Sequence, residues 1–398
     1  MTQREQQIEE LLTRGVVEVI DREHLRARLL KGDTLRVKLG IDPTSPNIHL
    51  GRSIPLLKLR DFQELGCQIV LIVGDFTGVI GDTSDKESER PMLSPDVIEK
   101  NMQTYTEQVG KLINLEKAEV HYNSTWLEKL RYEDIGTQAD AFSLAEFIAR
   151  DNIRRRLDDG KRVSLREVLY PLMQGFDSIA VNADVEIGGT DQRFNLLAGR
   201  TLQAQHGQAP QDILMTNLIL GTDGRKMSSS WGNTINLFDT PQEMFGKVMS
   251  IPDELIMEYL VQCTRVSMAD IATMAEEIVT GGNPRDTKVR LAKEIVTLYH
   301  GQEAAMTAET YFVETFSRGV LPENVREVEI EEGMKIVDAL ASVMLAASKS
   351  DARRKIEQGG VTIADEKITD VNQVMEKRFE GNVMRVGKKD FVKIVMKK

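Results

Sequence analysis

Short runs of apolar and β-branched residues alternate with segments of helical periodicity through the first half of the chain. This alternation is typical of a parallel sheet whose strands are joined by crossover helices. Strands are predicted at residues 36–40, 68–73, 119–122, 185–188 and 214–220. Helices are predicted at residues 54–65, 95–112, 144–155, 165–176 and 191–205. We therefore expect a doubly wound α/β domain whose ligand groups follow the carboxyl ends of the strands.

The second half of the chain has a different pattern. From residue 241 to about 317 the periodicity is helical throughout, with breaks at Ile251-Pro252 and at residues 281–284, which indicates a small helical domain. Residues 319–327 read as a polar linker, and residues 334–398 form a compact basic segment. No internal repeat and no low-complexity segment is found in the sequence.

Composition narrows the class of protein. The chain has 398 residues, enough for two or three domains, and 41% of them are hydrophobic. No apolar run approaches membrane-spanning length and the first residues do not resemble a signal peptide, so we expect a cytoplasmic protein without a membrane partner. Cys67 and Cys263 are too few for a disulfide framework or a cysteine-based zinc site.

The distribution of charge suggests a local contact with nucleic acid. The net charge is -11, but residues 334–398 carry 14 Lys+Arg and 9 Asp+Glu, a net +5, which leaves 37 and 53, a net -16, for the rest. An acidic surface does not favour RNA over most of the molecule. Any RNA contact is therefore expected in the basic segment.

The run IDPTSPNIHLGRS, residues 41–53, joins the first predicted strand to the first predicted helix. A bare glycine, Gly51, stands where the helix begins, and helix N-termini bind anions through unpaired N–H groups and the helix dipole. His49 and Arg52 add donors that could reach a phosphate. The alternative is a tight turn with a surface histidine. Neither GxGxxG nor GxxxxGK[ST] occurs, so nucleotide binding needs another motif.

Two further loops could serve a nucleotide. Residues 221–230, GTDGRKMSSS, offer one ammonium and three hydroxyls to a polyphosphate, although such a loop is also typical of a solvated hairpin. In GGTDQ, residues 188–192, Gly189 would let a ribose approach and Asp191 could accept from its hydroxyls. Thr190 or Asp191 could instead cap the following helix.

Two other segments combine polar groups that could bind a small substrate. Asp82 follows a strand and could hold an ammonium group, while Lys86 and Arg90 beyond it could neutralise a leaving phosphate. A charged surface loop is the alternative. In YPLMQGFD, Tyr170, Gln174 and Asp177 are spaced 4 and 3 apart and so share one helix face. Such a face either lines a pocket or is simply exposed.

The order of these motifs resembles a known family. HLGR at 49–52 and KMSSS at 226–230 are similar to the paired HIGH and KMSKS signatures of class I aminoacyl-tRNA synthetases. With GGTDQ, YPLMQGFD and the basic C-terminal segment, nearly the whole chain resembles the bacterial-type tyrosyl-tRNA synthetases. The resemblance implies a Rossmann-like catalytic domain at 1–220 with a dimer-forming insertion near 115–165. It further implies a KMSKS loop and helical anticodon-side domain at 221–325 and an α+β RNA-binding domain at 334–398, of the type named after ribosomal protein S-four.

The resemblance also implies an activity. The chain is expected to activate L-tyrosine with ATP, forming tyrosyl-adenylate and pyrophosphate, and to transfer tyrosine to the 3′ end of tRNA(Tyr). Mg²⁺ is expected to accompany ATP as part of the substrate, with no tightly bound protein metal site, and the protein is expected to be a homodimer. Two alternatives remain at this point, namely a tryptophan-specific synthetase of the same fold and a non-catalytic RNA-binding paralogue.

Site residues follow from the resemblance position by position. It assigns Thr44 and His49 to the ATP phosphates, Gly51 to the adenine, and Gly189 and Asp191 to the ribose. The two loops that grip pyrophosphate would supply Lys86, Arg90, Lys226, Ser229 and Ser230.

The resemblance also assigns the amino-acid pocket. The α-amino group of tyrosine falls to Asp82, Tyr170 and Gln174. Asp177 matches the partner of the phenol hydroxyl, and Asp42 and Gln192 match the neighbourhood of the carboxylate. Thr77, Asn123 and Trp126 are second-tier positions of the same pocket.

The basic segment contains SKSDARRKIEQGGVTI, residues 348–363, which resembles the S-four-type domain. There Lys349, Arg353, Arg354 and Lys355 would form a basic helix face for RNA, and residues 359–360 would turn into a strand. A solvated helix end is the alternative.

Three positions depart from the family pattern. Arg52 replaces the second histidine of HIGH, and Ser229 replaces the second lysine of KMSKS. Lys38 stands where some members place a tyrosine against the substrate phenol. The second partner of the phenol hydroxyl is therefore left open.

Overall fold

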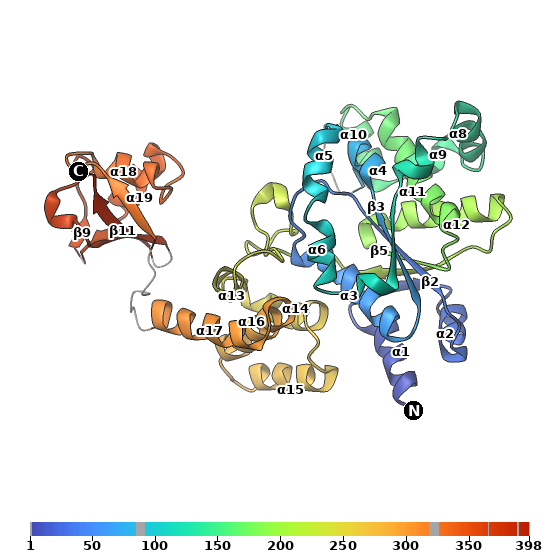
Figure 1. The fold of residues 1–398 in the computed structure, drawn as a ribbon, viewed down its shortest axis with the longest axis horizontal. Helices are drawn as coiled ribbons and strands as arrows, with labels where there is room; N and C mark the ends of the chain where they lie inside the picture. The colour runs from blue at the N-terminus through green and yellow to red at the C-terminus, as the bar shows by residue number, and fades with distance from the viewer. Residues whose placement is uncertain (1, 85–91, 318–325, 365, 388–389, 398) are drawn as a thin grey trace. The chain divides into compact units, whose positions relative to one another are not determined.

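The computed structural model describes residues 2–84, 92–317, 326–364, 366–387 and 390–397 (Figure 1). The chain divides into two compact units, Met1–Met306 and Thr307–Lys398, and each is described by itself.

The first unit is built on a six-stranded sheet with helices on both faces. Its strands are β1 (Val16–Ile20), β2 (Arg36–Ile41), β3 (Gln68–Val73), β4 (Ala118–Tyr122), β5 (Val185–Gly189) and β6 (Asp212–Thr216). The helices among them are α1 (Gln3–Thr13), α2 (Arg22–Lys31), α3 (Leu50–Glu64), α4 (Asp75–Ile80), α5 (Pro95–Met102), α6 (Tyr105–Gly110), α7 (Ser124–Leu127), α8 (Tyr132–Ala139), α9 (Leu144–Ile148), α10 (Asp151–Asp158), α11 (Leu165–Ala180) and α12 (Arg193–Gln205).

The strand order β1-β6-β5-β2-β3-β4 confirms the doubly wound sheet. The pairs β2–β3, β3–β4, β2–β5 and β5–β6 are parallel, and β1 joins β6 antiparallel at the edge of this sheet. The chain runs outward from β2 in one direction and later returns to the other side of β2 with β5. The carboxyl ends of β2 and β5 therefore flank the switch point where open sheets bind ligands.

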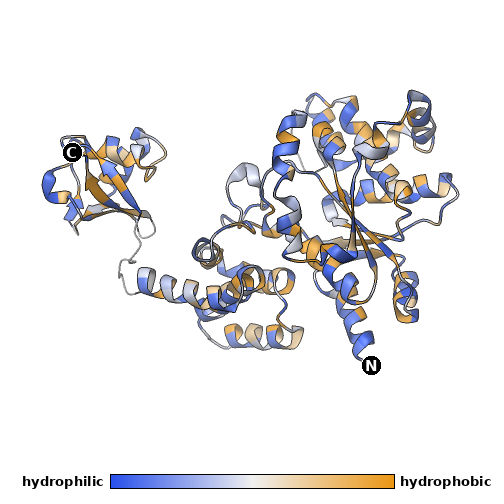
Figure 2. Cartoon of the chain, in the orientation of Figure 1, coloured by the Kyte–Doolittle hydropathy of each residue, from blue (hydrophilic) through white to orange (hydrophobic). Residues whose placement is uncertain are grey.

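Burial explains why the central strands form. In β3, residues 69–73 are all buried, as expected for a strand covered by helices on both faces (Figure 2). Lys38 of β2 and Glu186 of β5 depart from the apolar pattern, since both are buried charges on paired positions of neighbouring strands. A buried ion pair inside a parallel sheet calls for a specific explanation.

Several predicted boundaries were wrong. Helix α3 begins at Leu50 and not at residue 54, which makes His49 its N-cap residue. The predicted helix at 95–112 is two helices, α5 and α6, and that at 144–155 is broken between α9 and α10 by the extended backbone of Arg150. The strand predicted at 214–220 ends at Thr216, because residues 219 and 220 pair instead with residues 227 and 226.

The helical segment of the first unit follows the predicted breaks. Its helices are α13 (Pro241–Met249), α14 (Ile256–Cys263), α15 (Met268–Val279) and α16 (Pro284–His300), and α17 (Gln302–Phe312) follows them. Thr240 caps α13 by accepting from the Glu243 N–H, and Asn283 caps α16 by accepting from the Arg285 N–H, so both begin at proline-containing first turns. No helix in the described parts of the chain combines the length and apolar character that a membrane crossing requires.

The second unit is a small α+β fold. Its strands are β7 (Glu327–Ile330), β8 (Val361–Ile363), β9 (Glu366–Ile368), β10 (Val383–Val386) and β11 (Asp390–Met396), in the order β7-β11-β10-β8-β9. The helices α18 (Ile336–Ser342) and α19 (Lys349–Glu357) share one apolar core with this sheet. Gly359, with φ of 67°, turns the chain from α19 into β8, as the sequence pattern predicts.

Candidate active site

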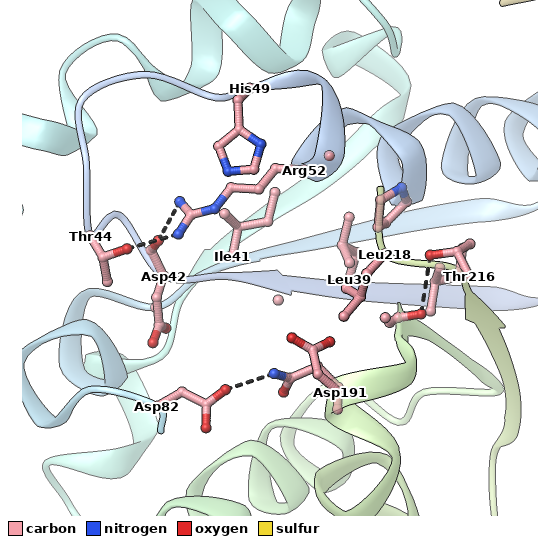
Figure 3. A pocket seen from close by; sticks show the side chains of 18 of the residues that line it. Leu39, Ile41, Asp42, Thr44, His49, Arg52, Asp82, Asp191, Thr216 and Leu218 are labelled. Atoms are coloured by element: carbon pink, nitrogen blue, oxygen red, sulfur yellow. Dashed lines mark hydrogen bonds between the residues drawn. The ribbon is translucent and has the colours of Figure 1, made fainter. Parts of the chain in front are cut away.

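A cavity of about 660 Å³ opens at the switch point between β2 and β5 (Figure 3). His49, which precedes α3, and Arg52 in its first turn lie on one side of it, and Asp82 and Asp191 on the opposite side. Among the predicted site residues, the cavity is lined by Asp42, Thr44, His49, Gly51, Arg52, Thr77, Asp82, Asn123, Tyr170, Gln174, Asp177, Gly189, Asp191, Gln192, Lys226, Ser229 and Ser230.

The turn before α3 places donors at the cavity. His49 is buried at the N-cap position of α3, and an antiparallel bridge to Asn236 holds its backbone. Gly51 lies within the first turn, where a Cβ would stand only 3.1 Å from His49 Nδ1 and 3.1 Å from Ile219 Cγ2. A side chain at position 51 would therefore push the histidine ring or Ile219 aside by a few tenths of an ångström, and glycine avoids this.

Arg52 braces the turn that precedes α3. Its guanidinium donates to Thr44 Oγ1 at 2.8 Å and to the Asp42 carbonyl at 3.3 Å (Figure 3). It also donates to the Tyr105 hydroxyl at 3.0 Å. A histidine ring could not make all three bonds, because it carries at most two donors. Arg52 thus orients Thr44 at the rim of the cavity.

The loop at residues 221–230 is a hairpin whose shape is fixed by Asn233. The Asn233 side chain donates to Asp223 Oδ1 at 2.7 Å and to the Lys226 carbonyl at 3.0 Å, and it accepts from the Ser228 N–H at 2.9 Å. A Cβ on Gly221 would lie 2.4 Å from the Asn233 carbonyl, so a side chain is excluded there. These contacts turn residues 226–230 toward the cavity that they line.

Lys226 faces the GGTDQ segment across the cavity. Its ammonium lies 3.2 Å from Asp191 Oδ2, and Ser229 Oγ donates to Ser45 Oγ at 3.4 Å. A Cβ on Gly189 would lie 2.6 Å from Asp191 Oδ1 and would displace that carboxylate. The alternative in which Thr190 or Asp191 caps the helix is not what the structure has, because the N-cap residue of α12 is Gln192 and that of the preceding 3₁₀ turn Thr190–Gln192 is Gly189, and no side chain caps either.

The other end of the cavity is acidic. Asp42 accepts from Thr77 Oγ1 at 2.7 Å and from the Tyr170 hydroxyl at 2.8 Å. Burial raises the pKa of the Asp42 carboxyl to about 6, against the opposing effect of these two hydrogen bonds. A cationic group bound beside Asp42 would favour the ionised carboxylate and so lower this pKa again.

Asp177 is less exposed than Asp42 and Asp82. It accepts from Trp126 Nε1 at 2.8 Å and from Asn123 Nδ2 at 3.2 Å. Burial raises the pKa of the Asp177 carboxyl to about 7, and the nearby charge of Lys38 opposes that rise. Trp126 does not line the cavity itself, so its contribution is to orient Asp177.

Asp82 belongs to a chain of polar side chains along one wall. Its Oδ1 accepts from Ser84 Oγ at 2.6 Å and its Oδ2 from Gln192 Nε2 at 2.6 Å. Asn195 Nδ2 donates at 3.0 Å to both Gln192 Oε1 and Gln174 Oε1. Asp82, Gln192 and Gln174 are thus linked along this wall through an asparagine that the sequence motifs do not contain.

Some predicted residues lie elsewhere. Lys86 and Arg90 fall outside the described residues. Lys349, Arg353, Arg354 and Lys355 lie on α19 of the second unit, where Lys349 pairs with Asp338 at 2.8 Å and Asp351 pairs with both Arg354, at 2.6 Å, and Lys355, at 3.1 Å. The side chains of Lys349 and Arg354 are nevertheless 72% and 67% exposed. The basic face is therefore accessible, though partly neutralised by acids of its own unit.

Lys38 does not line the cavity. Its ammonium is fully buried and donates to the Gln174 carbonyl at 2.9 Å, to Ser178 Oγ at 2.8 Å and to Glu186 Oε1 at 2.9 Å. These three bonds use all three ammonium protons. Sequence reasoning missed Glu186, Asn195 and Asn233, although a lysine and a glutamate inside two apolar strands were visible signals.

A protein metal site finds no support in the described residues, because they contain no group of three or more His, Cys, Asp or Glu side chains arranged to hold an ion.

The raised pKa of Asp177 predicts a dependence of stability on pH. A carboxyl whose pKa is higher in the folded state stabilises the fold at low pH, and this contribution is lost as pH rises through about 7. Asp177→Asn remains neutral throughout. We expect the unfolding free energy of the variant, relative to the parent, to improve by up to about 3 kcal/mol between pH 5 and pH 8. Urea unfolding at both pH values measures this, and parallel pH profiles would contradict it.

Known proteins match the chain over nearly its whole length. The family description "tRNA synthetases class I (W and Y)" matches residues 30–317, and "Tyrosine--tRNA ligase SYY-like C-terminal domain" matches residues 318–394. The chain is 45% identical over 401 residues to the "Tyrosine--tRNA ligase" of Carboxydothermus hydrogenoformans, covering 98% of each chain. It is 44% identical over 391 residues to the protein of the same name from Moorella thermoacetica, covering 96% of this chain and 94% of that one.

A solved structure supports the fold. A C-terminally truncated mitochondrial tyrosyl-tRNA synthetase of Aspergillus nidulans superposes with a TM-score of 0.65 at 22% identity, covering 78% of this chain and 94% of the other. At this identity the likeness bears on the fold alone, and it agrees with the doubly wound sheet described above.

Proposed function

Since the chain belongs to the class I tRNA synthetases and, among them, to the tyrosine–tRNA ligases, we propose that this cavity activates L-tyrosine with ATP for transfer to the 3′ end of tRNA(Tyr). The chain is thus an ATP-dependent aminoacyl-tRNA ligase. The relatives' shared name favours tyrosine over tryptophan as the amino acid, and it favours an enzyme over a non-catalytic paralogue.

One observation carries the assignment of the cavity. An acidic end with the buried Asp177 and an opposite end with a helix N-terminus and the Lys226 loop line one continuous space. The acidic end suits an amino acid with an ammonium and a hydroxyl, and the other end suits a polyphosphate. The two substrates would meet between Asp42 and His49.

In the proposed first step the tyrosine carboxylate attacks the α-phosphorus of ATP. The new bond joins a carboxylate oxygen to phosphorus, the bond to the bridging oxygen of the β-phosphate breaks, and pyrophosphate leaves with its electron pair. No protein nucleophile is required, so catalysis consists of binding the transition state better than the ground state.

The groups proposed to stabilise that transition state come from three elements. His49 and Thr44 would donate to the phosphates at the N-terminus of α3, and the Lys226 loop would neutralise the departing pyrophosphate with Ser229 and Ser230. Lys86 and Arg90 are proposed to act on the same leaving group from the segment outside the described residues. Arg52 would act by holding Thr44, to which it donates at 2.8 Å.

The acidic end is proposed to read the amino acid. Asp177 would accept from the phenol hydroxyl, with Trp126 and Asn123 holding its carboxylate. The α-ammonium would lie against Asp82, Tyr170 and Gln174. The assignment of Asp42 and Gln192 to the neighbourhood of the substrate carboxylate stays a prediction, as do Gly51 at the adenine and Gly189 and Asp191 at the ribose.

Mg²⁺ is proposed to enter as the complex with ATP, because phosphate oxygens and water are its preferred ligands. A cytoplasmic location is also proposed, because the proposed substrates ATP and tRNA are both found in the cytoplasm.

The second unit is proposed to bind tRNA through the exposed face of α19. Replacing Lys349, Arg353 and Arg354 together with alanine should lower tRNA charging at least about tenfold at physiological salt, because each phosphate contact contributes through counterion release. Tyrosine activation by the first unit should be unchanged. Aminoacylation and ATP–pyrophosphate exchange measure the two steps separately.

Lys393→Ala is the matched control, since Lys393 is a half-exposed cation on β11 of the same unit, paired with Glu327 at 2.8 Å. Equal charging by the triple variant and this control would contradict the role of α19.

A homodimer is proposed, with its interface near residues 115–165. Large apolar side chains are exposed there, among them Tyr132, 95% exposed, Leu144, 63%, and Leu165, 77%. Such a group of side chains on one segment marks an interaction surface. Tyr132→Asp/Leu144→Asp should therefore convert a dimer into a monomer in analytical ultracentrifugation, and a parent that is monomeric at micromolar concentration would refute the proposal.

The whole assignment is tested by aminoacylation of purified tRNA(Tyr) and tRNA(Trp) with their amino acids. We expect tRNA(Tyr) to be charged with tyrosine, and tRNA(Trp) not to be charged with tryptophan.

A further inference from the structure

The buried ion pair of Lys38 and Glu186 lies next to the proposed amino-acid pocket, outside the cavity itself. Lys38 and Glu186 are paired positions of the parallel strands β2 and β5, and their side chains are 0% and 1% exposed. Removing two charges from water is costly, and a well-packed apolar pair is often as stable. Stability alone is therefore a poor reason for charges at this position.

Glu186 is an acceptor surrounded by donors. Its Oε1 accepts from Lys38 Nζ at 2.9 Å and from Gln174 Nε2 at 3.1 Å. Its Oε2 accepts from Ser178 Oγ at 3.2 Å and from Gln211 Nε2 at 2.5 Å. Because an ionised carboxylate only accepts hydrogen bonds, the end of the Gln174 amide that faces it must be the NH₂ group.

The orientation of the Gln174 amide determines the orientations of the neighbouring amides on the cavity wall. With its NH₂ group toward Glu186, Gln174 must turn its oxygen to Asn195, which donates to it at 3.0 Å. The same Asn195 nitrogen donates to Gln192 Oε1 at 3.0 Å, and Gln192 in turn donates to Asp82 at 2.6 Å. The three amides of this hydrogen-bonded series are thus oriented by the carboxylates at its two ends, Glu186 and Asp82.

The buried amide of Asn195 supports this direction of hydrogen-bond donation. Asn195 is fully buried, and its Oδ1 has no hydrogen-bond partner among the described residues. Rotating the amide would not repair this, because Oδ1 would then face the two glutamine oxygens. The orientation of Asn195 is therefore imposed by its neighbours.

We propose that the Lys38–Glu186 ion pair is a positioning device that turns the oxygen of Gln174 toward the substrate ammonium. Lys38 pairs with Glu186 at 2.9 Å and also donates to the Gln174 carbonyl at 2.9 Å, so one buried cation fixes both the backbone and, through Glu186, the side chain of Gln174. The inference rests on the proposed role of Gln174 in binding the α-ammonium of tyrosine. Lys38 accordingly acts on the amino group and not on the phenol hydroxyl.

The test compares ligands with and without the ammonium. In the double variant Lys38→Met/Glu186→Leu, apolar side chains of similar size replace the pair, so no unpaired charge remains. Affinities are measured by calorimetry for tyrosine and for 3-(4-hydroxyphenyl)propanoate, which lacks the amino group. We expect tyrosine binding to weaken at least about tenfold while binding of the analogue changes less than about threefold.

Two further variants separate positioning from a purely structural role. Glu186→Gln keeps an oxygen toward Lys38 and Gln174, so it should retain the preference for tyrosine over the analogue. Gln174→Met should lose that preference, and adding the double variant to it should cause no further loss, because both act through one amide. If the double variant does not fold, Gln174→Met and Glu186→Gln still decide, since an unchanged preference in the first or a lost preference in the second would overturn the proposal.

The possible failures can be distinguished. Equal weakening of tyrosine and analogue in the double variant, or additivity with Gln174→Met, would overturn the positioning role and leave the proposed function intact. A parent protein that binds tyrosine no better than the analogue would contradict the proposed function itself.

Discussion

Replacing Asp177 with alanine is expected to abolish the selection of tyrosine over phenylalanine. Asp177 is buried and already accepts from Trp126 and Asn123, so it offers the phenol hydroxyl a buried acceptor whose orientation is fixed. A substrate without a hydroxyl leaves such a group unpaired, which is more costly than losing an apolar contact. Tyrosyl-tRNA synthetases are themselves the known example of this effect, with a rejection of phenylalanine of about 10⁵, and that magnitude is adopted for this chain.

The measurement is the ratio of kcat/KM for tyrosine and phenylalanine in ATP–pyrophosphate exchange. The ratio should fall from about 10⁵ to near unity in Asp177→Ala, mainly through a loss of activity with tyrosine. Thr77→Ser, which keeps a hydroxyl toward Asp42 on the same cavity wall, is the matched control and should preserve the ratio. A surviving preference for tyrosine in Asp177→Ala would mean that another group, such as Asn123, reads the hydroxyl.

Replacing His49 with alanine is expected to slow adenylate formation by roughly 2–4 kcal/mol of transition-state stabilisation, by analogy with single oxyanion donors. The side chain lies at the N-cap of α3, opposite the acidic end that is proposed to bind tyrosine. Tyrosine affinity should therefore change little, so the effect should appear in the rate of the chemical step.

Single-turnover formation of tyrosyl-adenylate separates these quantities. His24→Ala provides the control, because His24 lies on α2, 58% exposed, and pairs with Asp212 away from the cavity. Adenylate formation at the parental rate in His49→Ala would return His49 to the role of a turn residue.

The central strands could be predicted from the sequence because they are buried on both faces. A short continuous apolar run such as QIVLIV at residues 68–73 is typical of a strand in the middle of a sheet that helices cover on both faces. The edge strand β1 was missed, since five residues next to Gly15 carry little signal of their own and its pairing with β6 is a tertiary contact. The end of β6 was misjudged for the same reason, because residues 219 and 220 pair within the loop that carries Lys226.

The candidate site was predictable where motifs name the residues that face the ligand. Gly51 and Gly189 are glycines for reasons that the structure makes physical, since a Cβ at either would meet a side chain of the site within 3.1 Å. Asn195 and Asn233 could not be predicted, because they act by fixing neighbours and because an isolated asparagine has no pattern. Lys38 was noticed as a departure, but its partner Glu186 is 148 positions away and is found only when β2 and β5 lie side by side.

The central claim is that one cavity binds tyrosine and ATP and joins them. Its most direct test is ATP–pyrophosphate exchange by the purified full-length protein with tyrosine, with tryptophan and with no amino acid. We expect exchange that depends on tyrosine and is absent both with tryptophan and without an amino acid. Exchange driven by tryptophan, or no exchange with tyrosine from a chain that is folded by circular dichroism, would contradict it.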